Sequence, residues 1–274
     1  MKRMVILLAG IFAFVSTQSC NLLDSDGEGG IYPTTIRPIE PSKLAELRQR
    51  FEELNGPQVC FELDEYGFLK FAYCSGRPVL RAVLSEDSEV SVSKAKRMLL
   101  ANKEFTGLAD TAALAVIGFN DMPGCIRCDG SAGDIRTIKR GIDFERQVYL
   151  GLEVLESRYT VILDSIGVME MVGHWYDNIT VPISDKWSEN RARQSLAGKA
   201  IIWYGLGGDK NTFVVTPEDL LNRSRKVILQ HRVGGNIELR VAWEIPVGKG
   251  FLKWNIYVDT TTGEELETRQ LFVT

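Results

Sequence analysis

Few side chains in this sequence could carry catalytic chemistry. There are two histidines, His174 and His231, and they lie far apart in the chain. A zinc-peptidase helix needs the signature His-Glu-x-x-His, in which two imidazoles one turn apart bind the metal beside a carboxylate base. Neither that signature nor the Gly-x-Ser-x-Gly elbow of a serine nucleophile occurs. We therefore expect no catalytic residues, no metal site, no cofactor and no enzymatic activity.

Two further groups of residues suggest chemistry but fit simpler roles. The glycine-rich run at 205–208 lacks the Lys-Ser/Thr pair and the strand-to-helix context of a phosphate-binding loop, so we predict a turn there. Glu264, Glu265 and Glu267 lie around a predicted terminal turn, where solvated charge is more common than a catalytic carboxylate pair. Both groups are interpreted as structural.

The cysteines are the remaining chemically reactive group. Apart from Cys20, four cysteines remain, and an even number in an exported chain favours structural disulfides. We favour pairing Cys60 with Cys74 and Cys125 with Cys128, although all three connectivities are open. A zinc site made of all four thiolates is one alternative, and a thioredoxin-like redox centre at the second pair is another. The redox centre needs a helix N-terminus to lower a thiol pKa, whereas glycines and aspartates surround this pair.

The N-terminus has the features of a bacterial lipoprotein signal peptide. Lys2 and Arg3 form a cationic start, and residues 4–15 form an apolar run that is too short to span a membrane. Small residues precede Cys20, as in a relaxed bacterial lipobox, although an intervening glutamine departs from the strict pattern. We predict a signal peptide at residues 1–19 and lipidation of Cys20. The alternative is an ordinary secretory signal with an incidental cysteine.

Residues 20–41 are predicted to form a flexible tether, because they are polar and interrupted by glycine and proline. Asp24, Asp26 and Glu28 lie close to the predicted anchor and resemble the acidic export signals of some surface lipoproteins, although a solvated linker explains them equally well. We expect the protein in the bacterial cell envelope, anchored by lipid to the outer membrane. Whether it faces the periplasm or the exterior stays open.

Length and composition are typical of a globular protein with two small domains. The chain has 274 residues, of which 45% are hydrophobic and 25% are charged, and its formal net charge is -4. The negative balance and the lack of a basic stripe argue against nucleic-acid binding.

The elements expected in the first part of the chain follow from its apolar spacing. Apolar residues three and four apart predict a helix over 41–55, and residues 58–74 read as a β-hairpin. A second helix is expected from Ser91 or Ser93 to Gly107. Farther along, turn-forming residues predict a loop at 122–134, and strands are expected at 149–154, 159–163 and 168–172.

The C-terminal part has the clearest strand pattern. Apolar side chains alternate along 239–247 and 252–258, and turn-forming residues at 248–250 and 259–263 separate the strands, which predicts a meander of three antiparallel strands. Trp243 and Trp254 are expected to fill the core. The elements expected before the meander are a helix over 188–203, a short helix at 216–219 and a strand at 226–231.

Residues 91–179 resemble the fungalysin/thermolysin propeptide (FTP) domain in the order of their motifs. That family has a Phe-x-Gly-Leu-like helix end, a strand with Gln before Tyr-x-Gly-x-x-Val, an Asp-x-x-Gly turn and a closing Gly-aromatic segment. The matching positions are 105–108, Gln147, Tyr149, Gly151, Val154, Asp164, Gly167 and 173–176. Gln147 can satisfy backbone groups at a strand edge, and Gly151 permits a bulge or a close approach. The segment between Leu114 and Arg136 departs from the family pattern.

The last strands resemble the C-terminal signature of the PepSY module. That signature has an Ala-Trp strand, a second strand with an aromatic residue, and a Val-Asp-x-x-Thr-Gly-Glu turn. The matching positions are Ala242, Trp243, Trp254, Val258, Asp259, Thr262, Gly263 and Glu264.

Together the two resemblances reproduce the order of a thermolysin-type metalloprotease prosegment, without a peptidase signature. They imply an α+β protein of two small domains, each with helices packed on an antiparallel sheet: FTP-like at 42–181 and PepSY-like at 182–274. They also imply a non-enzymatic lipoprotein that binds, inhibits or assists the folding of a secreted metalloprotease or another envelope protein, by main-chain pairing at sheet edges. The alternative is a structural envelope lipoprotein that reuses the fold without a protease partner.

Overall fold

A computed structural model describes residues 32–74, 83–84, 86–126, 134–182, 184–221 and 223–272. The predicted signal peptide, the lipidation site Cys20 and Cys128 lie outside these residues. Within the described part, none of the helices combines the length and apolarity that a membrane span requires.

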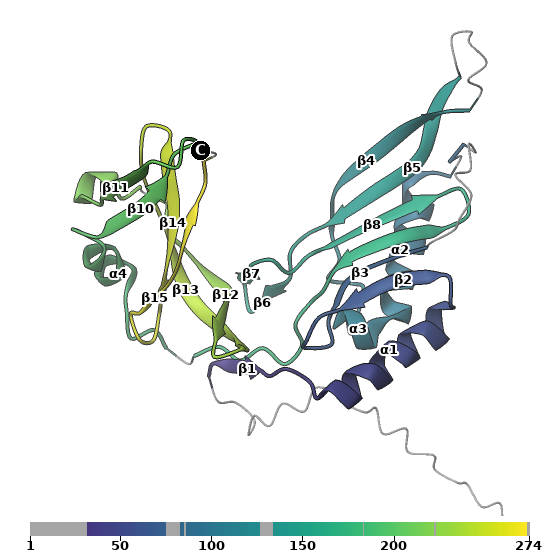
Figure 1. The fold of residues 1–274 in the computed structure, drawn as a ribbon, viewed down its shortest axis with the longest axis horizontal. Helices are drawn as coiled ribbons and strands as arrows, with labels where there is room; N and C mark the ends of the chain where they lie inside the picture. Colours follow the sequence, from purple (N-terminus) through teal and green to yellow (C-terminus); the bar gives the residue numbers. More distant parts are fainter. Residues whose placement is uncertain are drawn as a thin grey trace, which may run out of the picture.

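The chain has an α+β fold with two lobes, each built on an antiparallel sheet (Figure 1). The first lobe has a six-stranded sheet in the order β2-β3-β9-β8-β5-β4. Its strands are β2 (Val59–Leu63), β3 (Leu69–Cys74), β4 (Val116–Cys125), β5 (Ile135–Phe144), β8 (Tyr159–Asp164) and β9 (Val168–Gly173). Three helices pack on one face of it: α1 (Pro41–Asn55), α2 (Ser88–Ala101) and α3 (Lys103–Thr106).

The helices of this lobe follow the predicted pattern closely. Helix α1 has the predicted bounds and buries Leu47 and Phe51. Helix α2 begins at Ser88, earlier than predicted, because the Asp87 side chain caps it by accepting a hydrogen bond from the Val90 backbone N–H. After α3 the chain turns at Gly107 in the left-handed conformation, where the second helical stretch was expected to end.

Strand β4 takes in residues 122–125, the start of the loop that was predicted at 122–134; residues 127–133 of that loop lie outside the described part of the chain. It runs through Pro123 and Gly124 and pairs with β5 along its length, with an irregularity between Met122 and Pro123. Turn-forming residues fit here because β4 is an edge strand, where a proline needs no ladder partner on its outer side.

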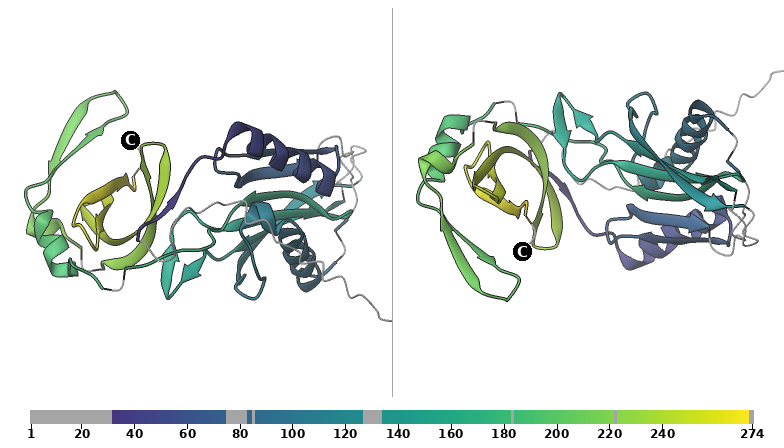
Figure 2. Two further views of the ribbon diagram at one scale, coloured as in Figure 1. Left: turned by 90° about the horizontal axis from the view of Figure 1, so that it is seen from below. Right: turned by 90° about the horizontal axis from the view of Figure 1, so that it is seen from above.

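The second lobe has a seven-stranded sheet in the order β15-β14-β13-β12-β7-β6, with β1 also paired to β13. The predicted meander is confirmed as β13 (Asn236–Lys249), β14 (Leu252–Asp259) and β15 (Glu265–Gln270), and β12 (Arg225–Val233) precedes it. The sheet is strongly curved, and the hairpin formed by β10 (Ala200–Tyr204) and β11 (Lys210–Val214) extends beside it (Figure 2).

Three strands of this sheet come from outside the predicted PepSY-like range 182–274. Strand β1 (Thr34–Ile36) pairs with β13, so the predicted tether at 20–41 ends in a strand. Strands β6 (Val148–Tyr149) and β7 (Leu152–Val154) lie within the range 42–181, but β7 pairs with β12 in parallel. Residues 149–154, predicted as one strand, are split because Leu150 and Gly151 form a turn with φ 49 and φ 80.

The helix predicted over 188–203 is shorter than expected. Helix α4 (Glu189–Ser195) is capped by Ser188, and the β-branched residues Ile201 and Ile202 that follow lie in β10. The short helix at 216–219 is confirmed as a 3-10 helix, η1 (Pro217–Asp219), with a capping box between Thr216 and Asp219.

A shared apolar core joins the two lobes. Tyr66 and Phe68 come from the β2–β3 turn of the first lobe and pack against Ile228, Leu239 and other residues of the curved sheet. The Tyr66 hydroxyl also donates a hydrogen bond to the Gly235 carbonyl oxygen at 2.7 Å. The lobes are therefore connected by buried side chains, and also by β1 and β7, which pair with strands of the second sheet.

Candidate functional site

Gln147 lies at the junction of the two lobes and is almost fully buried. Its side-chain amide donates to the Tyr176 carbonyl at 2.5 Å, and its Oε1 accepts from the Tyr176 N–H at 2.9 Å. The same oxygen accepts from the Ser157 hydroxyl at 3.0 Å. These are the backbone contacts expected for Gln147, and they hold the segment after β9 against the segment before β6.

His174 lies beside this junction and packs against aromatic side chains. Its ring stacks on Phe68 at a centroid distance of 4.9 Å, and its Nε2 lies 2.8 Å from the Tyr176 hydroxyl. Burial lowers the pKa of His174 to about 4, because the charged imidazolium would lose its hydration. His174 is therefore a neutral packing residue at physiological pH.

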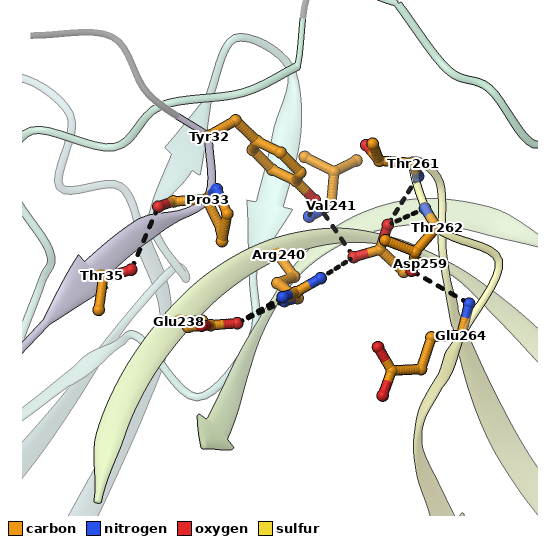
Figure 3. Close-up of polar contacts among 10 residues, drawn as sticks. All are labelled: Tyr32, Pro33, Thr35, Glu238, Arg240, Val241, Asp259, Thr261, Thr262 and Glu264. Carbon is orange, nitrogen blue, oxygen red and sulfur yellow. Dashed lines mark hydrogen bonds and ion pairs between the residues drawn. The ribbon is translucent and has the colours of Figure 1, made fainter. Parts of the chain in front are cut away.

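Asp259 is the centre of a second polar cluster, which closes the C-terminal sheet at the end of β14 (Figure 3). Its side chain has no exposed surface. One carboxylate oxygen accepts from the backbone N–H groups of Thr261 and Thr262 at 2.6 and 2.8 Å. The other accepts from an Arg240 guanidinium nitrogen at 3.0 Å. The carboxylate thus fixes the predicted Asp-x-x-Thr-Gly turn and ties it to β13.

The N-terminal segment completes this cluster. The Tyr32 hydroxyl accepts a hydrogen bond from the Val241 backbone N–H at 2.9 Å and lies 3.5 Å from the Asp259 carboxylate. Burial, with the nearby negative charge of Asp259, raises the pKa of Tyr32 to about 12. Arg240 also pairs with Glu238 at 2.6 Å. We call Tyr32, Glu238, Arg240, Asp259, Thr261 and Thr262 the closing-turn cluster.

The other residues of the two family signatures lie in turns or pack against the core. Gly263 has a φ of 75, and a Cβ built on it would lie 1.9 Å from the Trp187 ring, so no larger residue fits. Gly167 lies in the β8–β9 turn, where its N–H donates to the Asp164 carboxylate at 3.1 Å. Tyr149 packs partly against the core shared by the lobes.

The two tryptophans of the meander take part in packing. Trp254 is 1% exposed in the core of the second lobe. Trp243 is half-buried, and its indole N–H donates to the Trp187 carbonyl at 2.9 Å. Among the residues that the structure describes, no three histidine, cysteine, aspartate or glutamate side chains are grouped so that they could hold a metal ion.

The predicted disulfide between Cys60 and Cys74 is wrong, because both thiols are free. In the β2–β3 ladder Cys60 lies opposite Tyr73, whereas Cys74 lies opposite Val59. Successive residues of a strand point to opposite faces, so the two sulfurs lie on different sides of the sheet. Cys125 ends β4, and the bond predicted between it and Cys128 involves a residue outside the described part of the chain.

A different kind of surface lies at the edge of the first sheet. Strand β4 pairs with β5 on one side, and among the described strands none pairs with its other side. Such an edge leaves a row of backbone N–H and C=O groups available to another chain. The exposed side chains on β4 include Ile117 at 56% and Phe119 at 48%.

An open groove of about 430 Å³ runs between this edge and α2. Phe119 lines one wall, and the α2 residues Val92, Lys96 and Leu100 line the other. The Arg140 guanidinium lies 5.8 Å from the centre of the Phe119 ring and donates to the Asp121 carboxylate. We call this feature the α2–β4 groove. Sequence reasoning missed it because β4 was predicted to be partly loop.

Comparison with known proteins does not assign the chain to a family. No protein-family model matches it, and no curated protein matches it. Among solved structures it is similar to the Bacillus megaterium YpeB C-terminal domain, with 10% sequence identity and a TM-score of 0.33, over 86% of this chain and 100% of that one. Similarity at this level supports no inference about function, and the FTP and PepSY resemblances remain predictions.

Proposed function

We propose that this protein is a non-enzymatic lipoprotein of the bacterial cell envelope that binds a secreted metalloprotease and inhibits it or assists its folding. The free edge of β4 is the observation that supports a binding role most directly, because an unpaired strand can add a strand of another protein by main-chain hydrogen bonds. The order of FTP-like and PepSY-like motifs in the sequence supplies the class of partner.

The buried polar clusters support this proposal indirectly. The side chains of Gln147 and Asp259 have their hydrogen-bonding capacity directed to neighbouring backbone and to Arg240. Gln147 braces the junction of the lobes and Asp259 braces the C-terminal sheet, so the edge of β4 would be presented on a firm scaffold. They are positioned to maintain the fold rather than to contact a partner.

The test uses the purified chain and the secreted thermolysin-type metalloprotease of the same bacterium. The proposal predicts that the chain slows hydrolysis of a peptide substrate, or raises the yield of active peptidase on refolding, and that the two proteins co-elute. If the chain changes neither activity nor refolding and does not co-elute, the peptidase role is overturned and the structural envelope role is favoured.

The anchor is tested separately. We propose that Cys20 carries the lipid, so metabolic labelling with a fatty acid should mark the wild-type protein and leave a Cys20→Ala variant unmarked. Equal labelling of both proteins, or labelling of neither, would contradict lipidation at Cys20.

A further inference from the structure

The α2–β4 groove and the free edge of β4 lie next to each other, and this arrangement restricts what can bind there. An extended segment paired to β4 would place alternate side chains on the face of the sheet that carries the helices. Phe119 lies on that face, because its ladder partner Ile142 is in the core beneath the helices. Every second side chain of an added strand would therefore enter the groove beside α2.

The wall formed by α2 has an apolar, basic, apolar order. Val92, Lys96 and Leu100 are four residues apart and share one side of the helix. At a rise of about 1.5 Å per residue, Val92 and Leu100 are separated by about 12 Å along the helix axis. Two strand residues four positions apart are separated by about 13 Å. An extended segment that runs along α2 with apolar side chains four residues apart would therefore match this spacing.

The charges of the groove favour an acidic side chain between the two apolar side chains of the bound segment. Lys94 pairs with Glu86, whereas Lys96 and Arg97 have no ion-pair partner among the residues that the structure describes. The acidic residue that lines the groove is Glu89, which lies in the first turn of α2, about two turns before Lys96. A carboxylate midway between the two apolar side chains of an added strand would face Lys96 and Arg97.

We propose that the α2–β4 groove binds an extended segment of the form apolar-x-acidic-x-apolar, which adds to β4 as an edge strand. The proposal deepens the proposed function, on which it rests for the source of the segment, by naming the chemistry that the partner must present. Main-chain pairing supplies position along β4, the two apolar side chains contact Val92, Leu100 and Phe119, and the carboxylate sets the register.

The probe is the synthetic peptide acetyl-Thr-Val-Thr-Asp-Thr-Val-Thr-amide. In an extended conformation its two valines and its aspartate share one face. Binding to the full chain is followed by the amide chemical shifts of the protein. We expect saturable shifts confined to β4 and α2. A peptide with lysine in place of aspartate should bind about tenfold more weakly. A peptide N-methylated on its pairing edge should lose binding altogether, because that edge then has no N–H groups to donate and its methyl groups block close approach to β4.

Charge reversal in the protein supplies the matched test. The double variant Lys96→Glu with Arg97→Glu should bind the aspartate peptide about tenfold more weakly and the lysine peptide more tightly than the wild type does. Both positions are at least partly exposed on α2, so the fold should be retained, which a thermal melt checks. Lys253→Glu, on an exposed residue of the second lobe, is the control and should change nothing.

Three results would overturn the groove assignment: no saturable shifts up to about 1 mM peptide, equal binding of the aspartate and lysine peptides, or shifts centred on another sheet edge. The two proposals fail separately. Peptide binding without any effect on a peptidase would overturn the peptidase role and leave the groove assigned. Peptidase inhibition that is unchanged by the double charge reversal would overturn the groove and leave the peptidase role.

Discussion

The closing-turn cluster and the α2–β4 groove are opposite kinds of surface in one molecule. The closing-turn cluster is internal: Asp259 has no exposed surface and accepts hydrogen bonds from two backbone N–H groups and Arg240. The α2–β4 groove is open, with the exposed ring of Phe119 and two cations, Lys96 and Arg97, that have no ion-pair partner in the described part of the chain. The residues most recognisable in the sequence therefore hold the fold, while the surface suited to binding has no recognisable motif.

The largest effect should come from Asp259→Ala. Removing the carboxylate leaves Arg240 partly buried without this partner and frees two backbone N–H groups, so the free energy of unfolding should fall by about 3–5 kcal/mol. Urea denaturation measures this change. Asp134→Ala is the control, because Asp134 forms an exposed ion pair with Arg136 that should contribute about 0–1 kcal/mol. If the free energy of unfolding fell by similar amounts in the two variants, Asp259 would contribute no more to stability than an exposed ion pair does.

The next effect is a dependence of stability on pH at the junction of the lobes. Burial holds the pKa of His174 at about 4 in the folded protein, whereas an unfolded histidine titrates near 6.5. The histidine contribution is therefore fully present above about pH 6.5, and it is lost as the pH falls toward 4, by up to about 1.4 kcal/mol per pH unit.

Denaturation of His174→Gln between these pH values tests the contribution. The variant should show a shallower loss of stability than the wild type on acidification, because it has no imidazole to protonate. His231→Gln is the matched control for replacing a histidine. An unchanged pH slope in His174→Gln would show that His174 is not held neutral by the fold.

A smaller effect is expected for Gln147→Ala. The change leaves the buried backbone groups of Tyr176 without their side-chain partner, so the free energy of unfolding should fall by about 1–3 kcal/mol. Gln49→Ala removes an exposed contact to Glu53 on α1 and should change stability by no more than about 0.5 kcal/mol. Equal behaviour of the two variants in urea would argue against a bracing role for Gln147.

The smallest change in stability is expected in the α2–β4 groove. Phe119→Ser removes an exposed ring that has a cation–π contact with Arg140 at 5.8 Å, so the free energy of unfolding should fall by about 0.5–1 kcal/mol. The same variant should weaken binding of the aspartate peptide, because the ring lines the groove. A large loss of stability without a loss of peptide binding would reverse the roles assigned to the two regions.

Local patterns predicted the elements whose neighbours are close in sequence. Alternation along 239–258 gave the meander, and the Asp259 turn with Gly263 follows from turn chemistry that acts over five residues. Helix α1 was predicted at both ends because apolar spacing and a glycine stop agree.

Long-range pairing was not visible in the sequence. Strand β1 has three residues and is paired to β13, and β7 is paired to β12 and to β6. The apolar pattern at 149–154 predicted a strand there, but it showed neither the turn at 150–151 nor these partners. The edge strand β4 contains Pro123 and Gly124, which read as a turn when tertiary context is ignored. The α2–β4 groove depends on that strand and could not be predicted without it.

Native-state hydrogen exchange of the free chain, repeated with the aspartate peptide, tests the contrast between the two regions most directly. The backbone N–H groups of Asp259 and Thr260 donate to the Glu264 and Val241 carbonyls, so they should exchange only on extensive unfolding. Alternate amides of β4 face away from β5 and should exchange quickly until the peptide slows them. Fast exchange at Asp259 and Thr260 would show that the closing-turn cluster does not hold the fold, and no change along β4 on adding the peptide would show that β4 does not bind it.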